Sequence, residues 1–413
     1  MQTNVWKKHT REEIKQRVFD AIDQNVNFIE SDVIGIPGSR LDPRVFYQDA
    51  PFLADAPFLN ALIRNPNHIG CHTLGDSEPF FAGTQAIELD TIRICAEDIL
   101  NAQPGTVDGY VASGGTEANI QAAWIYRNYF QQEKGAQSND IAVICSADNH
   151  YSAAKAANLL NLRFVRINVD DDTRNIDPQH LSSTLSHLKN DGVKHVIVIA
   201  NMMTTMFGSV DHPDDYTPAL KAHDMEYFIH VDGAYGGFVY PFNGEEHGLD
   251  FSHPDISSVT LDAHKMVQAP YGTGVFLIRK GYMKYVRNSE ASYVKGLDAT
   301  LIGSRSGANA IAIWMILSTY GKQGWTEKIQ TLIERANRIA RALTHHNIRF
   351  FQERGSNIIT IRAEDMPIEL INAFHLVPDD HDNPRWVKIV VMEHVTDDKV
   401  SRFIEHLSMV VNT

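Results

Sequence analysis

Short, almost continuous runs of apolar and β-branched residues alternate with longer segments of helical periodicity through the middle of the chain. The apolar runs are residues 141–147, 163–169, 194–202, 227–233, 257–264 and 274–280. Strands that are apolar on both faces are typical of a mostly parallel sheet with helices on both sides. The pattern therefore predicts an α/β fold, in which ligands bind at the carboxyl ends of the strands.

The two ends of the chain differ from this middle part. Residues 10–30 have the spacing of an amphipathic helix, with Thr10 as N-cap and Glu13 completing a capping box. After about residue 306 the pattern changes to helical stretches at 307–320 and 324–346, strands at 357–362 and 386–395, and a final helix. We predict three units, which are an N-terminal helical arm (1–58), a large domain (59–305) and a smaller C-terminal α+β domain (306–413).

Composition narrows the possible functions. The 413 residues carry a formal net charge of -14, which argues against a nucleic-acid partner. Three cysteines without CxxC spacing support neither a disulfide framework nor a zinc cluster, and a reducing cytoplasm fits them best. The polar N-terminus and the lack of a long apolar stretch predict no export signal and no membrane span.

Three stretches carry residues suited to a common chemistry. The glycine turn of SGGTEANIQAAW (113–124) leads into a helix, and such a turn exposes backbone N–H groups that favour a phosphate. Asp232 ends one apolar strand, where a carboxylate is either a helix cap or the partner of a buried cation such as a protonated ring nitrogen. Lys265 ends the next strand, where desolvation lowers the pKa of a lysine and favours Schiff-base formation; a structural lysine would more often extend from a helix to solvent.

Together these residues point to one cofactor. A phosphate anchor, a carboxylate for a pyridinium nitrogen and an amine for an aldehyde are the groups that pyridoxal 5'-phosphate requires. No metal is predicted, because the acidic runs 169–175 and 379–384 lack the spacing of a calcium loop and His345–His346 has no third ligand.

With these motifs the chain resembles the pyridoxal-phosphate-dependent group II amino-acid decarboxylases of fold type I, from about residue 79 to the C-terminus. It is most similar to their short members, the archaeal tyrosine/aspartate decarboxylases and the bacterial histidine decarboxylases. The resemblance implies a mostly parallel sheet covered by helices, with a smaller C-terminal α+β domain. It also implies an L-amino-acid α-decarboxylase that acts through a Schiff base on Lys265 and releases carbon dioxide and an amine.

The resemblance implies roles for the residues that occupy the family's motifs. The expected phosphate contacts are Gly115 and Thr116 in SGGTEAN and His264 in DAHKM, with Gly303 and Ser304 in GSRSG reaching the phosphate of the neighbouring subunit. The expected ring contacts are His150 in HYSAAKA, stacked on the ring, Ala234 packed under it, and Asp232 at its nitrogen. A loop histidine at a strand end is the alternative for His150.

Two further motif residues complete the expected site. Thr205 in MTTMFGSVD is expected near the phenolic oxygen or the aspartate, with Asp211 behind it, and Met203 departs from the family's usual glycine as Gly233 does from its usual alanine. Tyr293 lies in a polar stretch that predicts a mobile lid, where its phenol could return a proton to Cα. An ordinary surface tyrosine is the alternative.

The resemblance leaves substrate and competing activities open. An acidic amino acid is expected first, with Arg305 or Lys295 as its cation, then an aromatic one, then histidine. A homodimer is expected, with the N-terminal helix as an exchanged arm. The alternatives are a carbon–carbon lyase of the sphingosine-phosphate lyase type and a catalytically silent regulator; retention of Lys265, Asp232 and His150 together argues against the regulator.

Overall fold

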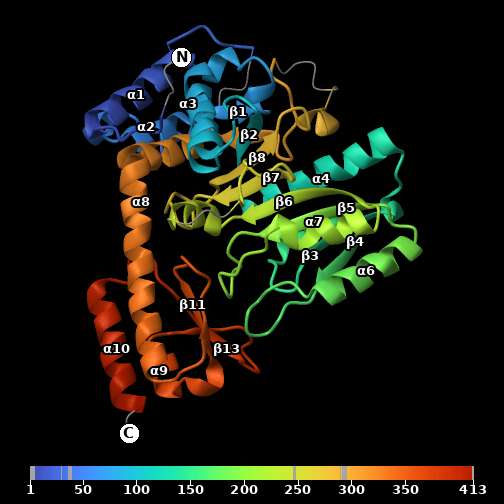
Figure 1. Cartoon of the computed structure of the whole chain (residues 1–413). Helices are drawn as coiled ribbons and strands as arrows, with labels where there is room; N and C mark the ends of the chain where they lie inside the picture. The colour runs from blue at the N-terminus through green and yellow to red at the C-terminus, as the bar shows by residue number, and fades with distance from the viewer. Residues whose placement is uncertain are drawn as a thin grey trace.

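A seven-stranded sheet forms the centre of the computed structural model, which describes residues 5–28, 30–35, 40–244, 248–288, 290 and 295–411 (Figure 1). Its strands, in spatial order, are β2 (Val107–Ala112), β8 (Gly274–Arg279), β7 (Ile256–Asp262), β6 (Glu226–Gly233), β5 (His195–Asn201), β3 (Ile141–Ser146) and β4 (Arg163–Ile167). Neighbouring strands are parallel except at β8, which is antiparallel to both β2 and β7. The predicted mostly parallel sheet is confirmed.

Every predicted apolar run of the middle region forms a strand, with ends within two residues of the expected ones. The sequence reading missed β2, because Gly109 interrupts its apolar pattern. A Cβ on Gly109 would lie 2.5 Å from the carbonyl oxygen of Phe276 in β8, so the glycine permits a close approach of the two backbones.

Helices cover both faces of this sheet. Alternate residues of the central strands face opposite sides, so that Val143 and Ile197 pack with α4 (Gly115–Lys134) and α5 (Ser152–Leu159). On the other face, Ile144 and Val198 pack with α6 (Pro178–Asn190) and α7 (Pro213–Ala222). Burial on both faces explains why the strands are apolar at consecutive positions.

The N-terminal helix α1 (Arg11–Gln24) begins with the predicted capping box. Thr10 Oγ1 accepts from the Glu13 backbone N–H at 3.2 Å, and the Thr10 backbone N–H donates to Glu13 Oε2 at 2.7 Å. The helix ends at Gln24, earlier than expected, and packs against α2 (Pro57–Arg64) and α3 (Ala82–Arg93) of the same chain. A two-stranded sheet of β1 (Asn67–Ile69) and β9 (Ser304–Ser306) lies nearby.

The C-terminal part is organised around the long helix α8 (Gly307–His345) (Figure 1). Its residue Gly321 is not helical, with φ of 63°, and a Cβ there would lie 2.4 Å from the Lys8 backbone nitrogen. The break predicted between the two helical stretches therefore occurs inside one element.

Beyond α8 lies a second, four-stranded sheet, called here the small sheet. Its spatial order is β10 (Phe350–Phe351), β11 (Ile358–Arg362), β13 (Trp386–Val390) and β12 (Val377–Pro378), with α9 (Ile368–Ala373) and α10 (Asp397–Val411) beside it. Because α8 packs against α1, α2 and α3 as well as α10 and β11, the domain limits at 58 and 305 stay a prediction.

The remaining described elements are short. A π-helical segment (Ile94–Ile99) extends α3, and 3-10 helices occur at Pro51–Asp55, His72–Leu74, Pro79–Phe81, Ser138–Asp140, Gly236–Phe238, Tyr240–Phe242, Met283–Val286 and Ala363–Asp365. Among the described helices, none has the length and apolar character needed to cross a lipid bilayer.

Candidate active site

A pocket of about 350 Å³ opens at the carboxyl ends of the parallel strands. Its lining includes most of the residues predicted from the sequence, which are Gly115, Thr116, His150, Thr205, Asp232, Ala234, His264 and Lys265. It also includes Glu117, Asn119, Asn201, Tyr151, Tyr235 and Asp262, which were not predicted. The structure thus brings segments from residue 113 to residue 265 to one place.

The glycine turn after β2 forms one end of the pocket. A Cβ on Gly115 would lie 3.0 Å from the Ala234 Cβ and 3.2 Å from Asp262 Oδ2, so only glycine leaves this space open. Glu117 accepts from the Ser113 backbone N–H at 2.6 Å and from the Tyr110 hydroxyl at 2.9 Å, which holds the turn against the first turn of α4. A tight turn at a helix N-terminus with no side chain in the way suits a phosphate.

Asp232 lies at the end of β6 and is almost fully buried. Its Oδ1 accepts from the Ala234 backbone N–H at 3.1 Å, and its Oδ2 accepts from Asn119 Nδ2 at 2.6 Å. Asn119 Oδ1 lies 2.9 Å from His230 Nε2, and burial lowers the pKa of His230 to about 4, so this imidazole is neutral at pH 7 and can donate. The carboxylate is therefore held in one orientation.

Asn119 also connects Asp232 to His150. Asn119 Nδ2 donates to Ser152 Oγ at 2.9 Å, and Ser152 Oγ lies 3.0 Å from His150 Nδ1. Burial lowers the pKa of His150, which favours its neutral form. Asn119 ends the SGGTEAN motif, so its position four residues after Gly115 on α4 was the available signal.

Lys265 lies in the turn that follows β7, with its side chain one-third exposed. Its Nζ is 3.9 Å from Asp262 Oδ2, and His264 Nδ1 is 2.8 Å from Asp262 Oδ1. Burial raises the pKa of Asp262 to about 6 although Lys265 and the Gly115 N–H oppose the shift, and burial lowers the pKa of His264. Asp262 therefore lies beside both residues of the His-Lys pair. Its place three residues before Lys265 was the only sequence signal.

The segment after β5 contributes Met203, Thr204 and Thr205 to the lining of the pocket. Met203 has φ of 70°, the left-handed conformation that glycine adopts most easily, which explains why the family usually has glycine there. Asp211 lies behind the pocket, where its Oδ2 accepts from the backbone N–H of Asn201 at 3.1 Å and from its Nδ2 at 2.5 Å. Burial raises the pKa of Asp211 to about 7 against these hydrogen bonds.

The raised pKa of Asp211 makes the free energy of unfolding depend on pH. A carboxyl group whose pKa is raised on folding stabilises the folded chain below its unfolded pKa, and this contribution is lost as the pH rises through the folded value. Asp211→Asn keeps an acceptor for Asn201 and removes the titration. Between pH 5 and pH 8 the parent should lose about 2–3 kcal/mol of unfolding free energy that the variant does not lose. Urea unfolding across this range measures it, and parallel pH curves would contradict the assignment.

Three predicted residues lie outside this pocket or outside the described residues. Gly303 and Ser304 are not among its lining residues, and Ser304 pairs with Ile69 in the β1–β9 sheet. Their expected contact with a neighbouring subunit stays a prediction. Tyr293 falls in the segment 291–294, which lies outside the described residues.

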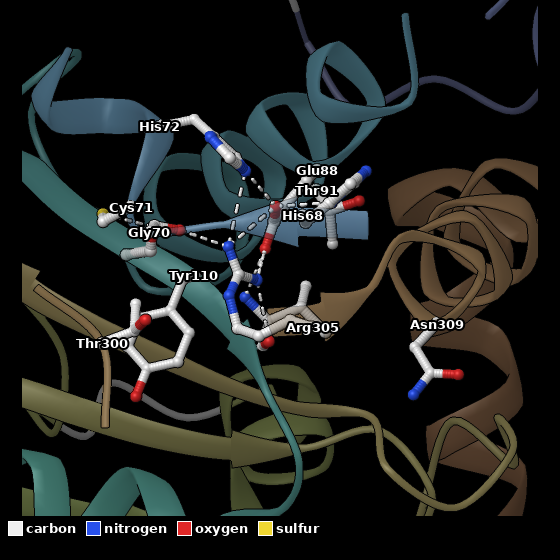
Figure 2. A network of polar contacts seen from close by, with 12 residues as sticks. His68, Gly70, Cys71, His72, Glu88, Thr91, Tyr110, Thr300, Arg305 and Asn309 are labelled. Carbon is white, nitrogen blue, oxygen red and sulfur yellow. Dashed lines mark hydrogen bonds and ion pairs between the residues drawn. The ribbon is translucent and has the colours of Figure 1, made fainter. Parts of the chain in front are cut away.

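Arg305 was expected as a cation for an acidic substrate, and this prediction is wrong. Figure 2 shows its guanidinium buried in a network of polar contacts. It pairs with both carboxylate oxygens of Glu88, donates to the carbonyl of Val111 at 3.0 Å and lies over the ring of Tyr110. A guanidinium committed to a buried carboxylate is not available to a substrate.

His68 and His72 belong to the same network. Both contact Glu88 Oε2, at 2.9 Å from His68 Nδ1 and 3.0 Å from His72 Nε2 (Figure 2). Together with Glu88 they have the spacing of a metal site. Because Arg305 already supplies the positive charge beside Glu88, the cluster is better explained as a structural network than as a cation site.

The pocket fits the predicted cofactor. The glycine turn leaves room that a Cβ would fill, and the carboxylate of Asp232 is held by two hydrogen bonds. Lys265 and His264 line the same pocket. The phosphate end, the carboxylate and the amine therefore occur in one cavity of suitable size.

Comparisons with known proteins agree with this choice of cofactor. The profile of the pyridoxal-dependent decarboxylase conserved domain matches residues 67–360. The chain is 46% identical to a tryptophan decarboxylase of Clostridium sporogenes over 97% of both chains. It is 30% identical to a probable L-tyrosine/L-aspartate decarboxylase of Methanocella arvoryzae, over 86% of this chain and 94% of that one.

Solved structures share the fold. An L-methionine decarboxylase variant of Streptomyces sp. 590 superposes with a TM-score of 0.70 at 20% identity, covering 96% of this chain and 93% of that one. Oryza sativa TDC, solved with PLP and tryptamine, superposes with a TM-score of 0.70 at 14% identity, covering 97% of this chain and 94% of that one. At these identities the similarity concerns the fold alone.

Proposed function

Because the chain belongs to the pyridoxal-dependent decarboxylase family, and is therefore a pyridoxal-phosphate-dependent amino-acid decarboxylase, we propose that it decarboxylates L-tryptophan. The predicted family, enzyme class, cofactor and fold class are confirmed. The carbon–carbon lyase and the silent regulator are not favoured. Membership of the family does not specify the amino acid, so the choice of tryptophan is the proposal.

The observation that carries this choice is the 46% identity to a tryptophan decarboxylase over nearly the whole of both chains. The site supports an aromatic substrate over an acidic one. Arg305 is buried and paired with Glu88, so it is not free for a side-chain carboxylate. Lys295 is exposed and is not among the residues that line the pocket. The aromatic rings of Tyr151 and Tyr235 line the pocket instead.

We assign the cofactor contacts as follows. The Gly115–Thr116 turn and His264 would hold the phosphate, Thr205 would lie at the phenolic oxygen, and Ala234 and His150 would enclose the ring. Asp232 would hold a proton at the ring nitrogen, since Asn119 and the Ala234 N–H keep its carboxylate in place. Lys265 would bind the cofactor covalently and later displace the product amine.

The chemistry divides between cofactor and chain. Bound pyridoxal phosphate supplies the sink for the electrons that carbon dioxide leaves behind. The chain orients the α-carboxylate, excludes water and returns a proton to Cα. Tyr293 stays our candidate for that proton donor, and unchanged turnover and by-products in Tyr293→Phe would exclude it.

Purified enzyme with cofactor is expected to convert L-tryptophan to equal amounts of carbon dioxide and tryptamine. An aromatic slot without a free cation should favour tryptophan over aspartate by about 100-fold or more in kcat/KM. Product analysis with tryptophan, tyrosine, histidine, aspartate and glutamate measures the order. Faster turnover of aspartate or histidine than of tryptophan would overturn the proposal.

The proposal includes a homodimer located in the cytoplasm. Ser304 lies on the β1–β9 sheet and does not line the pocket of its own chain. The expected contact of Ser304 with a phosphate would therefore be made to the cofactor of the neighbouring subunit. Cys71, Cys95 and Cys145 are buried free thiols, which suits a reducing compartment. A fully active monomer in light scattering would exclude the dimer.

A further inference from the structure

A tight turn after β5 carries Thr205 into the active-site pocket. This turn, residues 203–209, is closed by hydrogen bonds from the Thr204 N–H to the Ser209 carbonyl and from the Gly208 N–H to the Thr204 carbonyl, both at 2.9 Å. The hydroxyls of Thr204 and Ser209 lie 2.7 Å apart. Met203, Thr204 and Thr205 line the pocket, so the position of the 203–209 turn decides the shape of one wall.

The small sheet binds the tip of this turn. Lys388 Nζ in β13 donates to the Thr205 carbonyl at 2.8 Å, and Thr360 Oγ1 in β11 donates to the Met206 carbonyl at 2.9 Å. Thr360 and Lys388 are direct partners across the β11–β13 pair, so both side chains lie on one face of the sheet. Two neighbouring side chains thus hold two consecutive carbonyls.

Packing around these hydrogen bonds is close. Phe207 lies edge-on to Trp386, two residues before Lys388 in β13, with ring centroids 5.4 Å apart. The guanidinium of Arg174 lies 3.8 Å from the centre of the Phe207 ring. A Cβ on Gly208 would lie 2.8 Å from Ser356 Oγ and 2.9 Å from the Ile358 Cβ in β11, so glycine permits this close approach of the turn to the small sheet.

Burying part of the Lys388 ammonium group costs desolvation free energy, which its hydrogen bond to the turn offsets. Its side chain is only partly exposed, and burial lowers its pKa. In the part of the chain that the structure describes, Lys388 forms no ion pair, and Nζ donates to the Thr205 carbonyl instead. An apolar side chain would avoid the cost of desolvating an ammonium group, so its specific contribution is the hydrogen bond to the turn.

We propose that Lys388 is a positioning residue, which together with Thr360 holds the 203–209 turn so that Thr205 keeps its place in the cofactor pocket. This inference rests on the proposed contact between Thr205 and the cofactor. The small sheet then acts on the active site through two main-chain carbonyls, without any of its own side chains lining the pocket.

Lys388→Met tests this, because methionine keeps the apolar stem and removes the donor. Loss of a hydrogen bond from a charged donor should speed amide exchange at Thr204 and Gly208 about tenfold, and speed loss of cofactor at least about fivefold. Thr360→Val should act on the same amides more weakly. Lys388→Arg should restore both measurements, because a guanidinium can also donate to the carbonyl.

Lys399→Met is the matched control, since Lys399 is an exposed residue of α10 without a contact to the turn. It is expected to leave exchange and cofactor retention at parent values. Unchanged exchange of the turn in Lys388→Met would overturn the proposal, and so would faster exchange without faster cofactor loss. Failure of the substrate proposal is distinguishable, because the parent enzyme would then not decarboxylate tryptophan while the exchange result would be unaffected.

Discussion

Replacing Lys265 with alanine is expected to lower kcat by about a thousandfold or more, because the amine that binds the cofactor and releases the product is lost. Borohydride treatment of the parent enzyme should fix the cofactor on Lys265, and peptide mass spectrometry locates the adduct. The variant should keep its fold, since Lys265 lies in the turn after β7 and its side chain is one-third exposed.

Lys280→Ala provides the control, because Lys280 is an exposed lysine directly after β8 and is not among the pocket residues. It should retain parent activity and the same adduct. A reduced adduct on any other lysine, or turnover by Lys265→Ala near the parent rate, would show that another amine performs the reaction.

Replacing Asp232 with asparagine is expected to lower kcat by about 100- to 1000-fold, since a neutral amide no longer stabilises a protonated ring nitrogen. The phosphate contacts are on other segments, so the cofactor should still bind. The isosteric amide can still accept from Asn119 through its oxygen, although its NH₂ group then faces the Ala234 N–H. A moderate loss of stability is therefore expected together with the large loss of activity.

Asp250→Asn separates these two effects. Asp250 is also buried, and it accepts from Asn101 Nδ2 at 2.6 Å and from the Ser252 N–H at 2.8 Å, but it is not a pocket residue. This control should lose stability without losing kcat. Near-parent turnover by Asp232→Asn would mean that the carboxylate has a structural role only.

Local pattern was sufficient for most of the fold. The strands β3 to β8 were predicted because each is an almost continuous run of apolar and β-branched residues, and β2 was missed because Gly109 interrupts such a run where another backbone approaches. The helix cap at Thr10 was also predictable from local sequence, because both partners of the capping box lie within four residues.

The sequence by itself also determined the chemistry of the site. Asp232 and Lys265 lie at the ends of strands that the pattern predicts, and parallel strands bring their carboxyl ends to one edge of a sheet. The glycine turn before a helix was recognised from its own residues, although the strand before it, β2, was missed. Their order along the chain was therefore enough to predict the cofactor and to place these residues in one pocket.

Only the tertiary structure decided the partners of the polar side chains. Arg305 was open to a substrate role in the sequence, but it meets Glu88, 217 residues earlier in the chain, and Lys388 meets Thr205, 183 residues earlier. The periodic spacing of apolar residues shows which face of a helix or strand is buried, because many residues of the element contribute to this pattern. A hydrogen bond or ion pair instead requires two particular atoms within about 3 Å, and that distance is decided by how distant segments pack together.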